Sequence, residues 1–403
     1  MDKGVVCFRM DKLKLRHLNS LNELRDHSAA WDDLWWRAEV SLPTLRAETL
    51  AQWVEHFAPN QRFVATVIEQ DGTFIAAMPL VQARKASLIT VGTLPSNYWS
   101  NGGDLLLDCD AVNGRVIEEL VEGIKQIGWP LLWLEEVPSE SNRWTLFQKT
   151  YRKDGHTTST PLMYNIGTVD IDGDWEGYQA AWSSNHRHAV RKSVRKLQEL
   201  GDVNLVRHRE SAPDQLASLL QVAFEIEDRS WKGEAGTSIL RTSGMSDFFV
   251  RQAQQLTEWG QFELLFLEFK GRPIAFEYCY NAKGVCYSHK IGYDPEFRKF
   301  GPGRLLRCMQ LEEYFADPKQ RKLDTLGILC ESKAKWCDRA YPLTRLITDT
   351  GGLLGKSAMK FYTELWPYIR RVRGNGETVE MPKLGAIRTQ HPDLSKVELE
   401  LTV

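Results

Sequence analysis

The sequence predicts a mixed α/β (α+β) fold in two lobes, each a largely antiparallel sheet flanked by helices. Hydrophobic residues make up 42% of the 403 residues, which is enough to form the cores of more than one domain. Short runs rich in β-branched and aromatic residues alternate with segments of helical periodicity. The same order of elements occurs in both halves of the chain, as expected for an internal duplication.

The first copy opens with a hairpin. The stretch RFVATVIEQDGTFIAAMPLV, residues 62–81, has β-branched and aromatic residues on both sides of an Asp-Gly turn. The pattern then predicts a strand near 87–91, a helix near 111–127, a strand over 130–137 and a helix over 142–152.

The second copy repeats this plan. In ELLFLEFKGRPIAFEYCY, residues 263–280, Gly271, Ile274 and Ala275 match Gly72, Ile75 and Ala76 of the first hairpin. A strand over 285–293, a helix over 302–315, a strand over 322–328 and a helix over 332–338 are expected to follow. We therefore expect lobes at 1–165 and 166–370, followed by a polar tail at 371–403. Chance similarity between two α/β stretches is the alternative to duplication.

Composition excludes several classes of protein. A net charge of −2 and a pI near 6.5 give no general attraction to nucleic acid or anionic membranes, so any anion site must be local. The seven cysteines are scattered without a C-x-x-C pair, which predicts reduced thiols and no metal site. The charged N-terminus lacks a signal sequence, and no apolar stretch is long enough to span a membrane. A cytoplasmic protein without membrane insertion is expected, and the sequence does not indicate an oligomeric state.

FRKFGPGRLL, residues 297–306, is a candidate phosphate site because it joins a predicted strand to a predicted helix. Gly301 and Gly303 allow a ligand to approach the backbone closely, and the helix start offers N–H groups and the positive end of the helix dipole. Arg298 and Arg304 can add direct contacts, and Pro302 suits the first helical position. An ordinary Gly-Pro-Gly turn is the alternative.

The hairpin before this loop carries a candidate base, and its register decides which side chains meet. A three-residue loop ending at Gly284 places Glu277 opposite His289, which would form a base and its orienting carboxylate. A two-residue loop, Ala282-Lys283, instead places Glu277 opposite Ser288. Loop glycine chemistry favours the first register. Histidines in strands are more often packed than catalytic.

A basic helix is predicted over residues 185–200, where Val190, Val194, Leu197 and Leu200 form one apolar face. Arg187, Arg191 and Arg195 recur every four residues, so like charges repel unless an anion neutralises them. These arginines therefore form a solvated face paired with acids from elsewhere, or they meet an acidic substrate or the donor's phosphates.

The segment R-x-x-G-x-G at 298–303 resembles the acyl-CoA loop of GNAT acyltransferases. The wider chain resembles the tandem-GNAT group that includes CelD-type acetyltransferases and FemABX-like peptidyltransferases. The stretches that carry this likeness are WEGYQAAWSSNHRHAVRKSVRKLQELG (175–201), EIEDRSWKG (225–233), GRPIAFEYCY (271–280) and LGILCESKAKW (326–336). The first lobe lacks the donor loop, as such first lobes usually do. The chain also lacks the helical hairpin insertion and the basic charge of FemABX proteins, which argues against aminoacyl-tRNA as donor.

The resemblance implies roles for particular residues. The donor would be held by Tyr293, Arg298, Phe300, Gly301, Gly303 and Arg304. The catalytic set would be Glu277, His289 and Lys333, with Lys333 near the reacting carbonyl, where a cation could stabilise an oxyanion. The acceptor side would include Arg187, Arg191, Glu227, Trp231, Asp324 and Trp336. Each role has an alternative. Lys333 can be a surface lysine, Trp231 a core residue, and Asp324 a buried residue that needs a partner rather than a substrate.

These features predict an acyltransferase that moves an acetyl or other acyl group from acyl-CoA to an amine or hydroxyl without a metal. The CelD-type likeness implies a small-molecule or glycan acceptor in polysaccharide or envelope synthesis, and no nucleic acid partner. One alternative is a FemABX-like transferase that uses aminoacyl-tRNA. Another is a non-catalytic accessory protein of a polysaccharide synthase.

Overall fold

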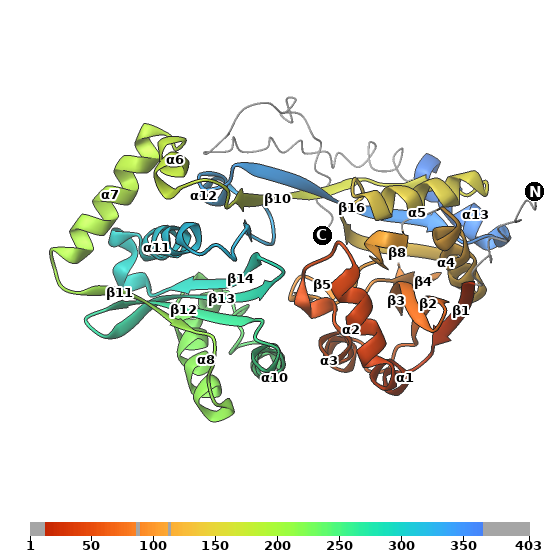
Figure 1. The fold of residues 1–403 in the computed structure, drawn as a ribbon, viewed down its shortest axis with the longest axis horizontal. Coiled ribbons are helices and arrows are strands. Elements are labelled where there is room, and N and C mark those ends of the chain that lie inside the picture. Colours follow the sequence, from red (N-terminus) through yellow and green to blue (C-terminus); the bar gives the residue numbers. More distant parts are fainter. Residues whose placement is uncertain (1–12, 86–88, 112–113, 366–403) are drawn as a thin grey trace, which may run out of the picture. The chain divides into compact units, whose positions relative to one another are not determined.

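The computed structural model describes residues 13–85, 89–111 and 114–365, which form two compact units (Figure 1). Within the described residues, unit 1 contains 13–161, except Ser41–Pro43, together with 344–365. Unit 2 contains Leu162–Leu343 together with Ser41–Pro43. The expected tail at 371–403 lies outside the described residues. Domain boundaries in the sense of separately folding pieces stay a prediction.

The sheet of unit 1 has six principal strands, and all neighbours are antiparallel except β4 and β8. Their order is β1 (Leu13–Leu18), β2 (Phe63–Gln70), β3 (Thr73–Lys85), β4 (Ile89–Thr93), β8 (Leu131–Val137) and β16 (Arg339–Asp349). Its helices are α1 (Leu21–Asp26), α2 (Ser28–Arg37), α3 (Ala47–Phe57), α4 (Gly114–Gln126), α5 (Asn142–Lys153) and α13 (Gly352–Lys360). The apolar face of α4 packs on β1, β2 and β3, where it forms much of the core.

Unit 2 repeats this topology. The strand order is β11 (Val203–His208), β12 (Phe262–Phe269), β13 (Arg272–Ala282), β14 (Val285–Tyr293), β15 (Lys322–Asp324) and β10 (Leu162–Asp170), and only β14 and β15 are parallel. The long helices are α7 (Ser184–Gln198), α8 (Pro213–Asp228), α10 (Met245–Glu258) and α11 (Pro302–Ala316). In Figure 1, α11 lies on one face of this sheet, and α8 and α10 lie on the other. The predicted fold class is confirmed.

The two hairpins match in detail. The turns Asp71-Gly72 and Lys270-Gly271 both have two positive φ angles, which fits a tight two-residue hairpin. Each hairpin then has a register shift at the same place, so that Ile75 is the extra residue in one copy and Ile274 in the other. The residues that matched in sequence thus also match in backbone geometry.

The sixth strand of each unit comes from the other half of the sequence. After β8 and α5 of unit 1, the chain enters unit 2 as β10. After β15 and α12 (Glu331–Ala334) of unit 2, the chain runs into β16, whose later residues, from Thr344, pair with β8 in unit 1. The C-terminal lobe expected at 166–370 differs from unit 2 for this reason.

Most elements of the second copy lie where the sequence predicts them, but two are shorter. Strand β15 ends at Asp324 instead of residue 328 because Leu326 and Gly327 both have positive φ angles, which are incompatible with an extended strand. Helix α12 covers Glu331–Ala334 instead of the predicted range 332–338.

Candidate functional site

The candidate site lies where β14 and β15 separate. The two strands pair only from Val285 to Tyr287, opposite Lys322 to Asp324. Strand β14 continues to Tyr293 along β13, and within the described residues no strand pairs with its other edge beyond Tyr287. An open strand edge next to a helix start offers backbone groups to a ligand.

The register of β13 and β14 differs from both expected registers. The turn is Lys283-Gly284, with positive φ at both residues, and a register shift lies between Tyr278 and Cys279. Glu277 therefore lies opposite Ile291, and His289 becomes the extra residue of a bulge. The predicted pairing of Glu277 with His289 is wrong.

Glu277 and His289 lie on opposite faces of the sheet. The His289 ring stacks on Tyr280 with a centroid distance of 4.9 Å, and it lies 5.7 Å from Phe249 of α10. Glu277 faces α11, where its carboxylate is 3.1 Å from Arg307. A base and an orienting acid must share a hydrogen bond, so these two residues cannot form that pair in this register. Their individual catalytic roles stay predictions.

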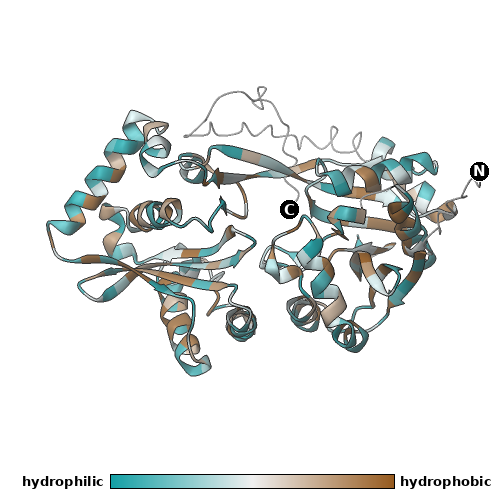
Figure 2. Cartoon of the chain, in the orientation of Figure 1, coloured by the Kyte–Doolittle hydropathy of each residue, from teal (hydrophilic) through white to brown (hydrophobic). Residues whose placement is uncertain are grey.

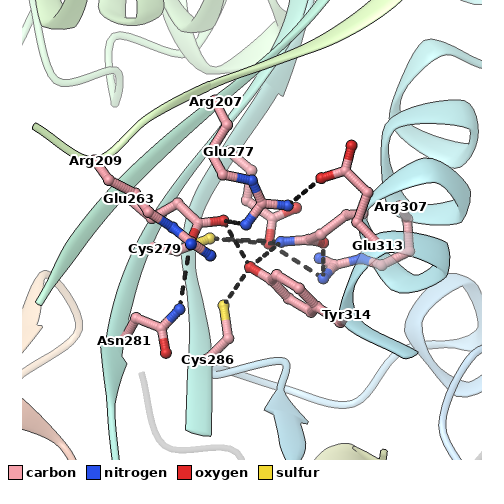
Figure 3. A network of polar contacts seen from close by, with 11 residues as sticks. Arg207, Arg209, Glu263, Glu277, Cys279, Asn281, Cys286, Arg307, Glu313 and Tyr314 are labelled. Carbon is pink, nitrogen blue, oxygen red and sulfur yellow. Dashed lines mark hydrogen bonds and ion pairs between the residues drawn. The ribbon is translucent and has the colours of Figure 1, made fainter. Parts of the chain in front are cut away.

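Glu277 belongs to a buried polar network between the sheet and α11 (Figure 3). Gln310 Nε2 donates to Glu277 at 3.3 Å, and Arg307 also donates to the Ser288 hydroxyl at 2.8 Å. Ser288 is the first residue of β14 beyond its pairing with β15. Arg307 thus ties α11 to β14 where the open edge begins.

A second carboxylate, Glu263 of β12, lies in the same network. It pairs with Arg207 and, at 2.9 Å, with Arg209, and it accepts a hydrogen bond from the Tyr314 hydroxyl at 2.8 Å. This cluster was not predicted from the sequence. Its signals were Glu263 near the start of a mainly apolar strand, and two arginines spaced i, i+2 at and just beyond the end of β11, a spacing that in extended chain places side chains on one face.

The start of α11 has the geometry expected of an anion site. Gly301 is in the left-handed conformation, with φ +65°, and no side chain caps the helix. The N–H groups of Arg304 and Leu305 both bind the Gly301 carbonyl. In the described part of the chain, the Gly303 N–H has no partner, and a Cβ at Gly303 would meet nothing within 4 Å.

The predicted donor residues divide into two groups. Arg298 is exposed and makes no polar side-chain contact within the described residues, so it is available to an anion beside Phe300, Gly301 and Gly303. Arg304 turns to α7 instead, where it donates to Ser193 Oγ at 3.1 Å and to the Ala189 carbonyl at 3.3 Å. Tyr293 is exposed at the end of β14.

The arginines of α7 have different surroundings. Arg187 donates to the Ala180 carbonyl at 2.7 Å, which fixes the end of the short helix α6 (Trp175–Ala180). Arg191 is exposed and lines a groove of about 750 Å³ between α6, α7 and α11, together with Trp175 and Cys308. Figure 2 shows the rest of α7 as largely hydrophilic. Of Arg187 and Arg191, the two predicted substrate residues on α7, only Arg191 lines this groove.

Asp324, Lys333 and Trp336 surround the end of β15. Asp324 is buried and accepts hydrogen bonds from the Tyr341 hydroxyl at 2.8 Å and from the Leu326 N–H at 2.9 Å. Burial raises the pKa of Asp324 and lowers that of Lys333. Lys333 Nζ donates to the carbonyls of Thr325 and Leu326, so it holds the loop that leads β15 away. Trp336 is a core residue.

The remaining predicted residues, Glu227 and Trp231, lie at the end of α8 and in α9 (Trp231–Glu234). Glu227 is buried, and it accepts from Lys232 Nζ at 2.6 Å and from the Ile239 N–H at 2.9 Å. Trp231 is 68% exposed, so the alternative that it is a core residue is wrong.

Residues 184–332 match the sequence profile of the acetyltransferase (GNAT) domain family. The match includes β11 to β15, α11 and the candidate site. Among the curated proteins searched, none matches the chain in sequence. The described residues contain no group of three or more metal-ligating side chains. They also contain no helix with both the length and the apolar character needed to cross a bilayer.

Solved structures resemble the whole architecture. A crystal structure of FemX is 12% identical, covers 87% of this chain and all of its own, and has a TM-score of 0.56. The C-terminal domain of a putative lysylphosphatidylglycerol synthetase from Agrobacterium fabrum is 12% identical, with 85% and 97% coverage and a TM-score of 0.50. L-PGS from Bacillus licheniformis is 13% identical, with 84% and 96% coverage and a TM-score of 0.50. At these identities the likeness shows a shared fold. The family match adds that residues 184–332 have the profile of a GNAT acetyltransferase domain.

Proposed function

We propose that the protein transfers an acyl group from acyl-CoA to an amine or hydroxyl acceptor at the open edge of β14. The observation that carries this proposal is the start of α11, where the Gly303 N–H has no partner within the described residues and a Cβ on Gly303 would have free space. Arg298, in the segment just before this helix, is exposed. This helix follows β14 through the short 3-10 segment Pro295–Phe300, and in the described structure the second edge of β14 has no strand partner beyond Tyr287. The diphosphate of the donor would lie at the helix start.

The reaction then needs no metal. Backbone N–H groups of β14 would polarise the thioester carbonyl, and the acceptor nucleophile would attack its carbon. The bond from carbon to sulfur breaks, and CoA leaves as its thiol after protonation. Lys333 would act indirectly, since its Nζ donates to the carbonyls of Thr325 and Leu326 and so holds the loop after β15.

The acyl group and the pathway are less constrained. Acetyl-CoA is the simplest donor, and the CelD-type likeness of the sequence favours an acceptor from polysaccharide or envelope synthesis. A donor carried by tRNA is the second candidate, because the shared fold includes FemX. The exposed basic side chains of α7 would suit such a polyanion. A non-catalytic accessory protein would bind CoA without turning it over.

Thermal stabilisation by acetyl-CoA tests the donor site. At a concentration one hundred times its dissociation constant, a ligand adds about 2.7 kcal/mol to the free energy of unfolding. Gly303→Val should abolish that gain without unfolding the protein, because its Cβ has room and the backbone there does not need glycine. Gly114→Val is the matched control, since Gly114 has the same free space at the start of α4, which occupies the equivalent place in unit 1.

The outcomes separate the candidates. Stabilisation that persists in Gly303→Val contradicts the donor site. Salt-dependent binding of aminoacyl-tRNA without any response to CoA favours the second candidate. CoA binding without thiol release on any acceptor tested favours the accessory protein.

A further inference from the structure

Three charged side chains form a cluster on the α8 face of the sheet, opposite to α11. They are Glu227 of α8, Lys232 of α9 and Lys290 of β14. Glu227 is 2% exposed and Lys290 9%. Lys232 Nζ is 2.6 Å from the Glu227 carboxylate and 3.5 Å from the Ile291 carbonyl, so the ion pair lies directly over the open half of β14.

The bulge in β14 explains why a lysine is buried here. His289 is the extra residue, and Lys290 lies opposite Tyr278. The Lys290 ammonium nitrogen is 5.1 Å from the centre of the Phe249 ring, and the His289 ring is 5.7 Å from the same ring. The bulge therefore turns two consecutive side chains to one face, as bulges near active sites often do. Lys290 lies three residues beyond the last pairing of β14 with β15.

The surroundings of Lys290 favour its neutral form. Burial, and next the positive charge of Lys232, lower the pKa of Lys290 to about 7, while Glu227 opposes this shift. Further titratable groups on this side are His289 on the same strand and Tyr278 and Tyr280 on β13. Both Glu227 oxygens are engaged, one by Lys232 and one by the Ile239 N–H. An exposed lysine would stay protonated at neutral pH.

We propose that Lys290 is a catalytic residue that removes a proton from the ammonium group of a primary amine acceptor. The proposal rests on the proposed acyltransferase function and concerns its amine acceptors. A base whose pKa lies near the working pH is partly in its proton-accepting form there, as general-base catalysis requires. Glu227 and Lys232 are positioning residues, because their ion pair covers β14 beside Lys290.

The proton balance is simple. The neutral Lys290 amine takes one proton from the acceptor and becomes an ammonium. The acceptor amine then forms a bond to the thioester carbon, and the bond from carbon to sulfur breaks. The second proton lost by the attacking nitrogen goes to the departing thiolate, which leaves as the CoA thiol. Lys290 then returns its proton to solvent.

Affinity labelling with bromoacetyl-CoA tests this without knowledge of the natural acceptor. The probe places a reactive carbon at the thioester, where a neutral amine displaces bromide and forms a bond from nitrogen to carbon. In the full chain, peptide mapping should find the label on Lys290. The labelling rate should rise with pH around a midpoint near 7.

Substitutions test whether the label depends on the Lys290 amine. Lys290→Met should abolish the label, and Lys290→Arg should also, since arginine stays protonated. Lys319→Met, which removes an exposed lysine from a turn, should label as the wild type does. Lys232→Met should move the midpoint to higher pH because a like charge is removed, and Glu227→Gln should move it to lower pH.

Each outcome decides something. CoA binding is measured separately by calorimetry. If CoA binds but the label is found on a different residue or on none, the role of Lys290 is wrong and the proposed function stands. A labelling midpoint above pH 9 also overturns it. Absence of CoA binding overturns both. The pH dependence of labelling is measured on the wild-type protein. It therefore tests the proposal even if a Lys290 variant fails to fold.

Discussion

The buried pair of Glu277 and Arg307 should contribute to folding whatever its part in catalysis. Their charged groups are 3.1 Å apart and almost without solvent contact. Arg307→Met leaves Glu277 as an uncompensated buried charge, and breaking such a pair typically costs about 3 to 5 kcal/mol. Urea unfolding of the variant measures this. The double change of Arg307→Met with Glu277→Met should recover much of the loss, and a single change that costs under about 1 kcal/mol contradicts the structural role.

Lys290 should make stability depend on pH. The folded protein binds its proton with a pKa of about 7, against an ordinary value of 10.5, so the unfolded chain holds more protons between these values. Stability is therefore reduced below pH 7 and rises as pH increases toward 10.5. Lys290→Met removes this cost, and replacing buried charge with apolar groups is often stabilising by about 1 to 4 kcal/mol. Thermal unfolding should show a larger gain at pH 6 than at pH 9, and an equal gain at both contradicts this account.

At the scale of single elements, the start of α11 depends on Gly301. A side chain in the left-handed conformation costs about 1 to 2 kcal/mol, and a Cβ here would also lie 3.2 Å from Ser193 Oγ. Gly301→Ala should therefore lower the melting temperature and loosen α11 against α7. Gly303→Ala, two residues further along the chain, where a Cβ would meet nothing within 4 Å, serves as the control and should leave the melting temperature unchanged. Equal effects in both variants contradict this explanation.

Elements were predicted from sequence far better than their pairing. The two repeated hairpins and helices α4, α5, α7 and α11 follow from turn dipeptides and periodicity, which are local signals. The register of β13 and β14 does not, because no dipeptide encodes the bulge at His289. One residue of slip moves every side chain to the other face, so Glu277 and His289 separate and Lys290 becomes buried. The predicted pairing of Glu277 with His289 failed at this step, while the donor-binding roles of Arg298, Gly301 and Gly303 stay predictions.

At the scale of the whole molecule, the two copies were recognisable but the exchange of their last strands was not. The sequence of β16 can indicate a strand that is partly buried in a sheet. It contains no information on which of the two sheets this strand joins. Contiguous lobes were therefore the natural expectation. Because the later residues of β16 complete the sheet of unit 1, the folding of unit 1 depends on distant sequence, whereas β10 is continuous with the rest of unit 2.

This connectivity leads to a test. A chain ending at Leu343 lacks Leu346 and Ile347, both fully buried, and it leaves the edge of β8 without its partner. Hydrogen exchange should show that Leu131–Val137 loses protection, because an uncovered edge and a lost apolar layer both favour local opening. The hairpin of β12 and β13 has all of its partners in unit 2 and should stay protected.

A chain ending at Leu365 is the control for that truncation. It keeps β16 and α13 and removes only sequence beyond the described residues, so protection of β8 should equal that of the full chain. Addition of a peptide with residues 344–365 to the shorter chain should restore protection in proportion to its concentration, since binding to the folded form shifts the equilibrium by mass action. Protection of β8 that survives the loss of β16 would show that unit 1 folds without the exchanged strand, and the interdependence of the two halves would then be wrong.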